Sequence, residues 1–389
     1  MDPRELFYIK PSVYISSYCY SVLRLEPWTT CSIGCPYCYA RWYRGPHGEP
    51  KPQYIVARLY EKLARRLSGS RLPPPYFRLA TLSEPLQDPE PQLHLSYRLA
   101  STSLRRETPL IINTKLPGRL LREEWLSLLG EMADRLLVLV QVSLSTLGDS
   151  ALVLEPGAEP PLERLEAIEE LARHRIPVAV RLQPLLPGFE EEHVRAAVEA
   201  GLRGALLAIG EPIRLAPGEL TSISRLLGVE WRGWESYELH RVEGRSGLLH
   251  PPLSWRLEMH RALDAAMEAL GRPYHACKDG LTLHNIPGDC CGYTAIGGYV
   301  ALRPTLHEAL LYKREHGHWP SSMDELCGYA ETLSELYVCG ERLDRYPSLV
   351  ARAYRLHERR LERILRALRE QRDPAYRKLI EPMEKLEQA

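Results

Sequence analysis

The run Leu136-Leu-Val-Leu-Val-Gln-Val-Ser-Leu-Ser145 is apolar at almost every position before its serines, with Gln141 as the exception. It lacks the alternation of apolar and polar residues that marks a strand with one solvated face. Near-continuous Val and Leu are typical of a parallel strand that is covered on both faces. The run therefore predicts a central strand of a sheet that has other structure packed on each side.

Runs of the same kind recur before and after it, and helical patterns separate them. The further strand-like runs are Ser21–Leu25, Tyr76–Ala80, Leu110–Thr114, Pro177–Leu182 and Gly204–Ile209. The helical patterns cover about residues 51–68, 91–106, 119–133, 161–174 and 189–201. Six strands that alternate with five helices predict a parallel sheet with right-handed crossovers. We therefore expect an α/β fold, a partial TIM-like (βα)6 barrel, over residues 1–210.

The helical pattern at 161–174 indicates which side chains point toward the sheet. Leu162, Leu165, Ile168 and Leu171 recur at helical spacing, and Glu and Arg occupy the opposite face. Pro161 suits the first turn of a helix. We predict that Leu162 and Ile168 both face inward.

The strand–helix alternation stops after Gly210, and this divides the chain further. We expect a connecting segment over 211–250, a cysteine-containing domain over 251–340 and a C-terminal helical tail over 341–389. The tail has arginines at three- and four-residue spacing on one helix face, namely Arg352, Arg355, Arg359, Arg363 and Arg366. Because Glu362 can pair with Arg366, a solvated face with ion pairs is favoured over a phosphate-binding stripe.

The overall composition excludes several classes of protein. The 389 residues include 50 basic and 50 acidic side chains, and 44% are hydrophobic, which describes a globular chain and not a disordered one. A net charge of zero gives no general argument for nucleic-acid binding. The chain has no apolar run of about 18 residues and no secretory signal, so we expect no membrane association and a cytoplasmic location.

A group of three cysteines follows the first strand. Cys31, Cys35 and Cys38 are spaced four and three residues apart, so their sulfurs can converge on one soft metal centre. Three ligands leave one iron of a four-iron cluster open to another ligand. A closed zinc site completed by a fourth ligand is the alternative, although zinc ligands usually come in two pairs.

The motifs around this group resemble the radical S-adenosylmethionine (SAM) superfamily, in particular its branch that looks like spore photoproduct lyase. The resemblance runs from Pro27 to Gly188, about 40% of the chain. It rests on the cysteine loop and on four later motifs: Glu84-Pro-Leu-Gln87, Asn113-Thr-Lys115, Glu155-Pro-Gly157 and Pro184-Leu-Leu-Pro-Gly188.

The resemblance implies a [4Fe-4S] cluster bound by Cys31, Cys35 and Cys38, with SAM chelating the open iron through its amino and carboxylate groups. One electron then cleaves SAM to methionine and a 5′-deoxyadenosyl radical, which abstracts hydrogen from a substrate. A reducing partner such as ferredoxin or flavodoxin is implied as the source of that electron.

Further side chains are expected to bind SAM at the carboxyl ends of the strands, where active sites of parallel barrels lie. Ser83 and Glu84 suit the SAM ammonium, Lys115 suits the carboxylate, and Ser143 and Arg181 point toward the same mouth. Tyr37 is the aromatic residue that precedes the last cysteine of the superfamily motif. The full set of expected cofactor-binding residues is Tyr37, Ser83, Glu84, Lys115, Ser143 and Arg181.

One departure from the spore photoproduct lyase pattern affects the expected substrate. Those enzymes carry a hydrogen-donating cysteine just before the Ser-Asp pair of the second-strand loop, and Leu82 stands at that position here. The resemblance therefore indicates how a radical is generated and leaves the substrate open. Nucleic acid is one candidate, and a peptide or a small molecule is the other. The rival hypothesis is a non-catalytic iron–sulfur protein with a binding or sensing role.

Five more cysteines lie beyond residue 270, namely Cys277, Cys290, Cys291, Cys327 and Cys339. Glycines near them would let a loop wrap a metal. An auxiliary iron–sulfur cluster is one interpretation of this group. A zinc site using His275 or His284, and buried thiols or a disulfide without metal, are the alternatives.

Overall fold

The computed structural model describes residues 6–12, 17–44, 48–70, 72–237, 247–281, 289–371 and 374–387. Its centre is a seven-stranded sheet in the order β1-β2-β3-β4-β5-β6-β9, and every neighbouring pair is parallel. The strands are β1 (Arg24–Leu25), β2 (Phe77–Leu79), β3 (Leu110–Thr114), β4 (Val138–Ser143), β5 (Val178–Leu185), β6 (Leu207–Pro212) and β9 (Tyr274–Ala276). The predicted α/β fold with a partial TIM-like barrel is confirmed.

Helices connect the strands and continue after the sheet. Those of the first part are α2 (Arg41–Arg44), α3 (Tyr54–Leu67), α4 (Glu90–Leu93), α5 (Leu95–Arg105), α6 (Glu123–Asp134), α7 (Ser150–Leu154), α8 (Pro161–Arg173) and α9 (Glu190–Leu202). The later ones are α10 (Pro217–Leu227), α11 (Leu253–Glu268), α12 (Leu306–His316), α13 (Met323–Leu333), α14 (Ser348–Glu370) and α15 (Pro374–Glu387). Short 3₁₀ turns are η2 (Pro117–Leu121), η3 (Thr294–Ile296) and η4 (Gly340–Arg345), and β7 (Glu235–Ser236) pairs with β8 (Leu249–His250).

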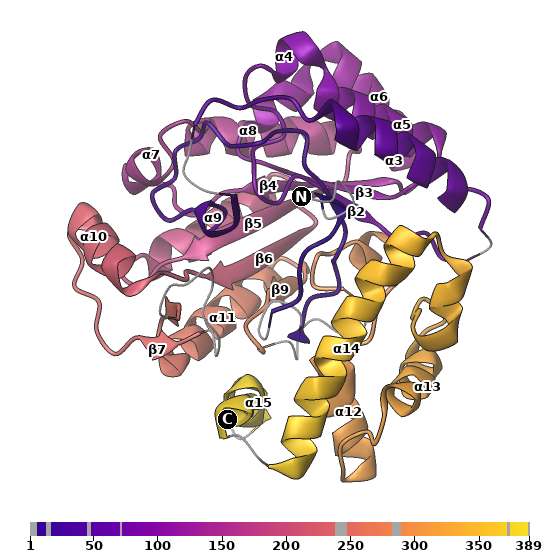
Figure 1. The fold of residues 1–389 in the computed structure, drawn as a ribbon. Helices are drawn as coiled ribbons and strands as arrows, with labels where there is room; N and C mark the ends of the chain where they lie inside the picture. Colours follow the sequence, from indigo (N-terminus) through magenta and orange to yellow (C-terminus); the bar gives the residue numbers. More distant parts are fainter. Residues whose placement is uncertain are drawn as a thin grey trace.

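The two faces of the sheet pack against different parts of the chain. Val138, Val140 and Val142 of β4 lie in the core shared with the helices of the first part. Leu139, between them, points to the opposite face and packs in a second cluster with Cys277 and Cys290. Figure 1 shows the corresponding layers, with α3, α5, α6 and α8 on one side of the strands and α12 to α15 on the other. The run that predicts a doubly covered strand is thus buried at every position of β4.

The seventh strand comes from a part of the chain with no strand pattern. β9 pairs with β6, with Ala208 opposite Tyr274 and Gly210 opposite Ala276. The segment expected to form a cysteine-containing domain therefore adds a strand to the barrel. Its cysteines pack against the face of the sheet that carries Ile111 and Leu139, which we call the inner face. The remaining boundaries of the expected domains stay predictions.

One inward-facing residue of α8 is predicted wrongly. Ile168 is fully buried, as expected, but Leu162 is 58% exposed. Arg164, two residues later, is buried instead, because it donates to the Glu155 carboxylate and to the Ser143 carbonyl. A charged residue that is satisfied by buried acceptors has displaced the leucine from the inward position.

In the C-terminal helix α14, one ion pair agrees with the prediction that the arginines lie on a solvated face. Arg366 lies 3.9 Å from Glu362, one turn away on the exposed side of the helix. Among the described residues, no helix combines the length and the apolar character that crossing a bilayer requires.

We predict that Ile168→Ala lowers the free energy of unfolding by about 2–5 kcal/mol, because it opens a cavity in a closely packed core. Leu162→Ala, on the same helix, should change it by no more than about 0.5 kcal/mol. Chemical denaturation monitored by circular dichroism measures both. Equal losses for the two variants would show that α8 packs in another orientation.

Candidate active site

A cavity of about 140 Å³ opens at the carboxyl ends of the strands. All of the residues expected from the sequence to bind the first cluster and SAM line it: Cys31, Cys35, Tyr37, Cys38, Ser83, Glu84, Lys115, Ser143 and Arg181. They come from the loop after β1, the loop after β2, the ends of β3 and β4, and the middle of β5. The parallel sheet thus brings together residues that lie up to 150 positions apart in the sequence.

The cysteine loop is held in place by the side chain of Gln87. Its Oε1 accepts from the backbone N–H of Ser32 at 2.6 Å, and its Nε2 donates to the carbonyl of Thr30 at 2.8 Å. Gln87 is completely buried. A single amide thereby satisfies backbone groups on both sides of Cys31, which fixes the loop before any metal is bound.

A glycine allows a second segment to approach the same loop closely. Gly157 N–H donates to the carbonyl of Ile33 at 2.9 Å. A Cβ atom on Gly157 would lie 2.8 Å from the Cα of Ile33, closer than real contacts allow. Only glycine fits there, so the segment that carries Glu155 can rest directly on the cysteine loop.

The three thiols of this loop suit a soft metal centre with an open side. None of the three forms a disulfide in the described structure, Cys31 and Cys35 are buried, and Cys38 is half-buried. Burial raises the pKa of the Cys31 thiol to about 11, so in the metal-free protein it carries its proton, which a bound metal must displace. Three sulfur donors that border one cavity match an iron–sulfur cluster whose remaining position faces a ligand in that cavity.

Beside the cysteines, Glu155 forms a buried ion cluster. Its carboxylate accepts from the Tyr37 hydroxyl, from Lys115 Nζ at 2.9 Å and from Arg164 Nη1 at 2.5 Å. Burial disfavours the ionised carboxylate, but Lys115 and Arg164 outweigh this and lower the pKa of Glu155 to about 2. Burial likewise opposes the charge on Lys115, whereas Glu155 raises the pKa of that lysine. Glu155 and Lys115 therefore both stay charged near neutral pH.

Two further carboxylates shape the loop after β2. Glu84 accepts from the Thr114 hydroxyl at 2.6 Å and from the Lys115 N–H at 2.8 Å, so it joins this loop to the end of β3. Glu26 accepts from the Thr81 N–H at 2.7 Å and from the Ser83 hydroxyl at 3.1 Å. Burial raises the pKa of Glu84. The side chains expected to bind SAM are thus positioned by a network within the protein.

On the other side of the cavity, Arg181 belongs to a second ion cluster. Its Nη2 lies 2.8 Å from Glu211, which also contacts Arg214 Nη2 at 2.5 Å and Lys278 Nζ at 3.3 Å. Burial disfavours the Glu211 charge, but the three cations outweigh it and lower the pKa of Glu211 to about 2. We call Arg181, Glu211, Arg214 and Lys278 the Glu211 cluster.

The downstream cysteines fall into two places. Cys277, Cys290 and Cys291 are free and buried together on the inner face of the sheet. Arg181 Nη2 donates to Cys277 Sγ at 3.3 Å. A hydrogen bond from Cys290 and the nearby cations overcome burial and lower the pKa of Cys277 to about 6. His275 is buried beside them, and His284 lies outside the described residues.

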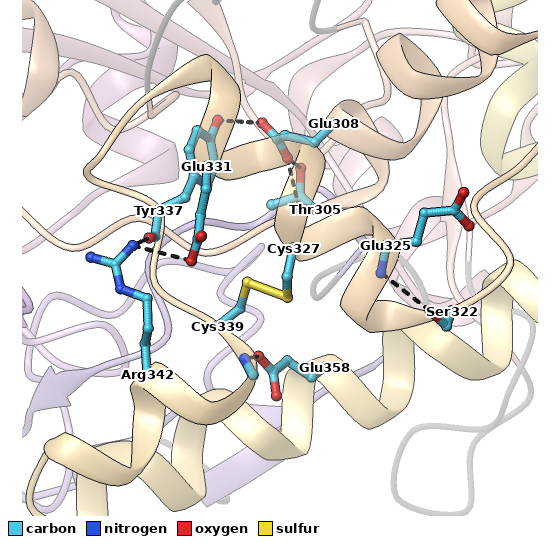
Figure 2. Close-up of a disulfide and its surroundings, with 11 residues drawn as sticks. Thr305, Glu308, Ser322, Glu325, Cys327, Glu331, Tyr337, Cys339, Arg342 and Glu358 are labelled. Atoms are coloured by element: carbon cyan, nitrogen blue, oxygen red, sulfur yellow. Dashed lines mark hydrogen bonds and ion pairs between the residues drawn. A yellow bond between two sulfur atoms is a disulfide. The ribbon is translucent and has the colours of Figure 1, made fainter.

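Cys327 and Cys339 are joined to each other by a disulfide. Figure 2 shows this bond between α13 and the segment before η4, with Glu358 of α14 beside it. The two sulfurs and a Glu358 oxygen lie within 4.8 Å of one another. The expected auxiliary cluster included Cys327 or Cys339 as a ligand, and the disulfide removes both from the set of available thiols. The expected alternative of a disulfide without metal holds for this pair, and Cys277, Cys290 and Cys291 are left for any second metal centre.

Several residues of the site were not singled out from the sequence. Glu26 and Glu211 each follow directly on an apolar strand run, and this position at the strand ends is the signal that could have identified them. Arg214 follows Glu211 by three residues, but Lys278 follows it by 67 and carries no such signal. Their contacts depend on the pairing of β6 with β9, which no pattern in the sequence predicts.

Comparison with known proteins identifies the first part of the chain. Residues 25–200 match the family model of the radical SAM superfamily. Spore photoproduct lyase in complex with dinucleoside spore photoproduct is similar in structure, with a TM-score of 0.52 and 14% identity over 70% of this chain and 79% of that one. A variant of that lyase with bound AdoMet and the same dinucleoside gives 0.51 and 13%, over 66% and 76%.

No curated protein matches the sequence. The match over residues 25–200 confirms the resemblance to the radical SAM superfamily that the cysteine loop predicts. Over about 70% of the chain, the fold is similar to that of spore photoproduct lyase.

We predict that Glu155→Gln lowers the free energy of unfolding by about 3–5 kcal/mol at pH 7, because it leaves Lys115 and Arg164 buried without a counter-charge. The folded-state pKa of Glu155, about 2, lies below the usual 4.5. The ionised carboxylate therefore stabilises the protein above pH 4.5, and this stabilisation is lost as the pH falls toward 2.

Urea denaturation of wild type and variant at several pH values measures this difference. The difference should be full at pH 7 and should shrink below about pH 4.5. Glu163→Gln, an exposed carboxylate on the same segment, serves as the matched control and should change stability by no more than about 0.5 kcal/mol. A constant difference from pH 7 to pH 3 would contradict the ion cluster.

Proposed function

We propose that this protein is a radical SAM enzyme that cleaves SAM reductively at a [4Fe-4S] cluster held by Cys31, Cys35 and Cys38. The observation that supports this most directly is the single cavity bordered by those thiols and by Ser83, Lys115 and Ser143. When bound, the cluster supplies one electron to the SAM sulfonium, and the resulting 5′-deoxyadenosyl radical abstracts hydrogen from the substrate. The match of residues 25–200 to the superfamily supports the same chemistry.

The side chains of this cavity would bind SAM through groups that suit its charges. Lys115 remains protonated beside Glu155 and would attract the SAM carboxylate. Ser83 and Ser143 offer hydroxyl groups at the cavity surface, and Glu84 would accept from the SAM ammonium. Arg181 is bound on several sides by Gln183, Glu211 and Cys277, so it would orient other groups more than contact SAM itself.

The substrate is proposed to enter the same cavity, where Leu82, Tyr39 and Ile213 provide apolar surface. The structural relatives were solved with a dinucleoside photoproduct, which supports nucleic acid as one substrate class. Leu82 lines the cavity and has no transferable hydrogen of the thiol kind, so the reaction would differ from one that returns hydrogen from a cysteine there. A peptide or a small molecule is the second class. A ferredoxin or flavodoxin would supply the electron.

We predict that the anaerobically reconstituted protein, reduced with dithionite, converts SAM to 5′-deoxyadenosine. Chromatography of the acid-quenched reaction measures the product. Lys115→Ala should raise the dissociation constant of SAM about tenfold or more, because a charge-assisted contact to the carboxylate is lost. Lys62→Ala, an exposed lysine on α3, should leave it unchanged.

An intact cluster that yields no 5′-deoxyadenosine with or without candidate substrates would contradict the proposal. A protein whose cluster is structural would also bind SAM equally weakly in wild type and in Lys115→Ala. That result would favour the rival class of iron–sulfur proteins that sense or bind.

A second metal centre remains a proposal for Cys277, Cys290 and Cys291 alone, since these are the downstream thiols that are free in the described part of the chain. We predict that the triple variant Cys31→Ala, Cys35→Ala, Cys38→Ala keeps iron and an iron–sulfur absorbance after reconstitution. Colorimetric iron analysis measures the content. An iron-free triple variant would assign the downstream thiols to packing or to another metal.

A further inference from the structure

The cavity has two sides with different charge balance. On the side of the cysteine loop, Lys115, Arg164 and Arg24 stand against Glu155, Glu84 and Glu26, so positive and negative charges are equal in number. On the opposite side, the Glu211 cluster sets three cations against one carboxylate. All members of the Glu211 cluster are buried, with side chains that are 2–8% exposed.

The surplus of positive charge persists when the neighbouring groups are counted. Cys277, which accepts from Arg181, and Cys291, which also interacts with Arg181, are the groups that can carry a negative charge there. Arg78 interacts with Cys291 and adds a fourth cation, so that even with both thiols ionised four cations stand against three anions. Asp279, the next carboxylate along the chain, is paired with Arg256 at 2.5 Å and with His260 at 3.0 Å. Within the described residues, the Glu211 cluster is therefore positively charged.

Arg214 directs part of this charge into the cavity. Its Nη2 donates to Glu211 and its Nη1 to the Tyr237 hydroxyl at 3.3 Å, and no other hydrogen bond of its guanidinium is found in the described part of the chain. The Arg214 guanidinium lies over the ring of Tyr39 at 5.6 Å, and Lys278 Nζ lies over the same ring at 5.8 Å. Both contacts hold the cations in place through the negative face of the ring.

A second arginine on the cavity wall is also short of partners. Arg78 is 6% exposed and lines the cavity. Its Nη2 donates to Asn113 at 2.8 Å, but its Nε is buried and has no hydrogen-bond partner in the described structure. A buried donor without an acceptor costs free energy, so this guanidinium is poorly compensated by the protein, and an anion in the cavity that Arg78 lines would offset its charge.

From these observations we infer that the substrate carries an oxyanion, a phosphate or a carboxylate, that binds on the Glu211 side of the cavity against Arg214, with Lys278 behind it and Arg78 on the facing wall. This inference rests on the proposed function, since it assigns one side of the cavity to SAM and the other to substrate. SAM itself has two positive groups and one carboxylate, so the neutral side suits it better than the cationic one. The anionic group would hold the substrate in one orientation, with its reacting carbon over the SAM side.

Isothermal titration of the cluster-loaded protein tests this with sodium phosphate, sodium acetate and sodium chloride at equal ionic strength. At least one oxyanion should bind at least about tenfold more tightly than chloride. The oxyanion that binds more tightly shows whether the substrate group is a phosphate or a carboxylate. Arg214→Gln should weaken that binding about tenfold or more, since a buried charged partner is removed. Glu211 would keep Arg181 and Lys278 in this variant. Arg232→Gln, on an exposed arginine, is the control and should change nothing.

Three results would overturn the inference. The first is that neither oxyanion binds more tightly than chloride to the wild-type protein, a measurement that needs no variant. The second is that both Arg214→Gln and Lys278→Gln bind the oxyanion as the wild type does. The third is that phosphate competes with SAM, which would assign these cations to the SAM carboxylate. Oxyanion binding without SAM cleavage would contradict only the proposed function, and SAM cleavage without oxyanion binding would contradict only this inference.

Discussion

The ionised carboxylate of Glu155 joins the parts of the site that no single element contains. It binds Tyr37 of the cysteine loop, Lys115 at the end of β3 and Arg164 of α8. Removing a charge of this kind is costly, because burial leaves its partners without water or counter-charge. Gly157, two residues further, lets the same segment rest on the cysteine loop. The position of the thiols of the cysteine loop therefore depends on a buried charge balance.

Short, nearly continuous apolar runs predict the first six strands, because a strand buried on both faces must be apolar, whatever surrounds it. Helix α8 shows the limit of that reasoning. Arg164 is buried because it pairs with the buried Glu155. A prediction that assigns every charged residue to the solvent side places Leu162 on the inward face instead. β9 is missed for another reason. Its sequence, Tyr274-His-Ala276, is too short to show a period, and its pairing with β6 is decided by tertiary packing.

The candidate site is predicted more fully than the fold around it. Cysteine spacing and residues at strand ends reflect local chemistry, and the parallel sheet brings those ends together at one edge. The Glu211 cluster follows from long-range packing, since Lys278 reaches Glu211 only after β9 has joined the sheet. The same packing buries Cys277 beside Arg181. One side of the cavity could thus be derived from sequence, and the charged side opposite could not.

The central claim is that SAM binds directly to iron held by Cys31, Cys35 and Cys38, in the cavity that these residues border. The most direct measurement is electron–nuclear double resonance on the reduced, reconstituted protein with SAM labelled with ¹⁵N at its amino group. The account predicts a ¹⁵N hyperfine coupling to the cluster, absent with unlabelled SAM and absent in Cys35→Ala. A cluster signal that SAM leaves unchanged, with no ¹⁵N coupling, would contradict it.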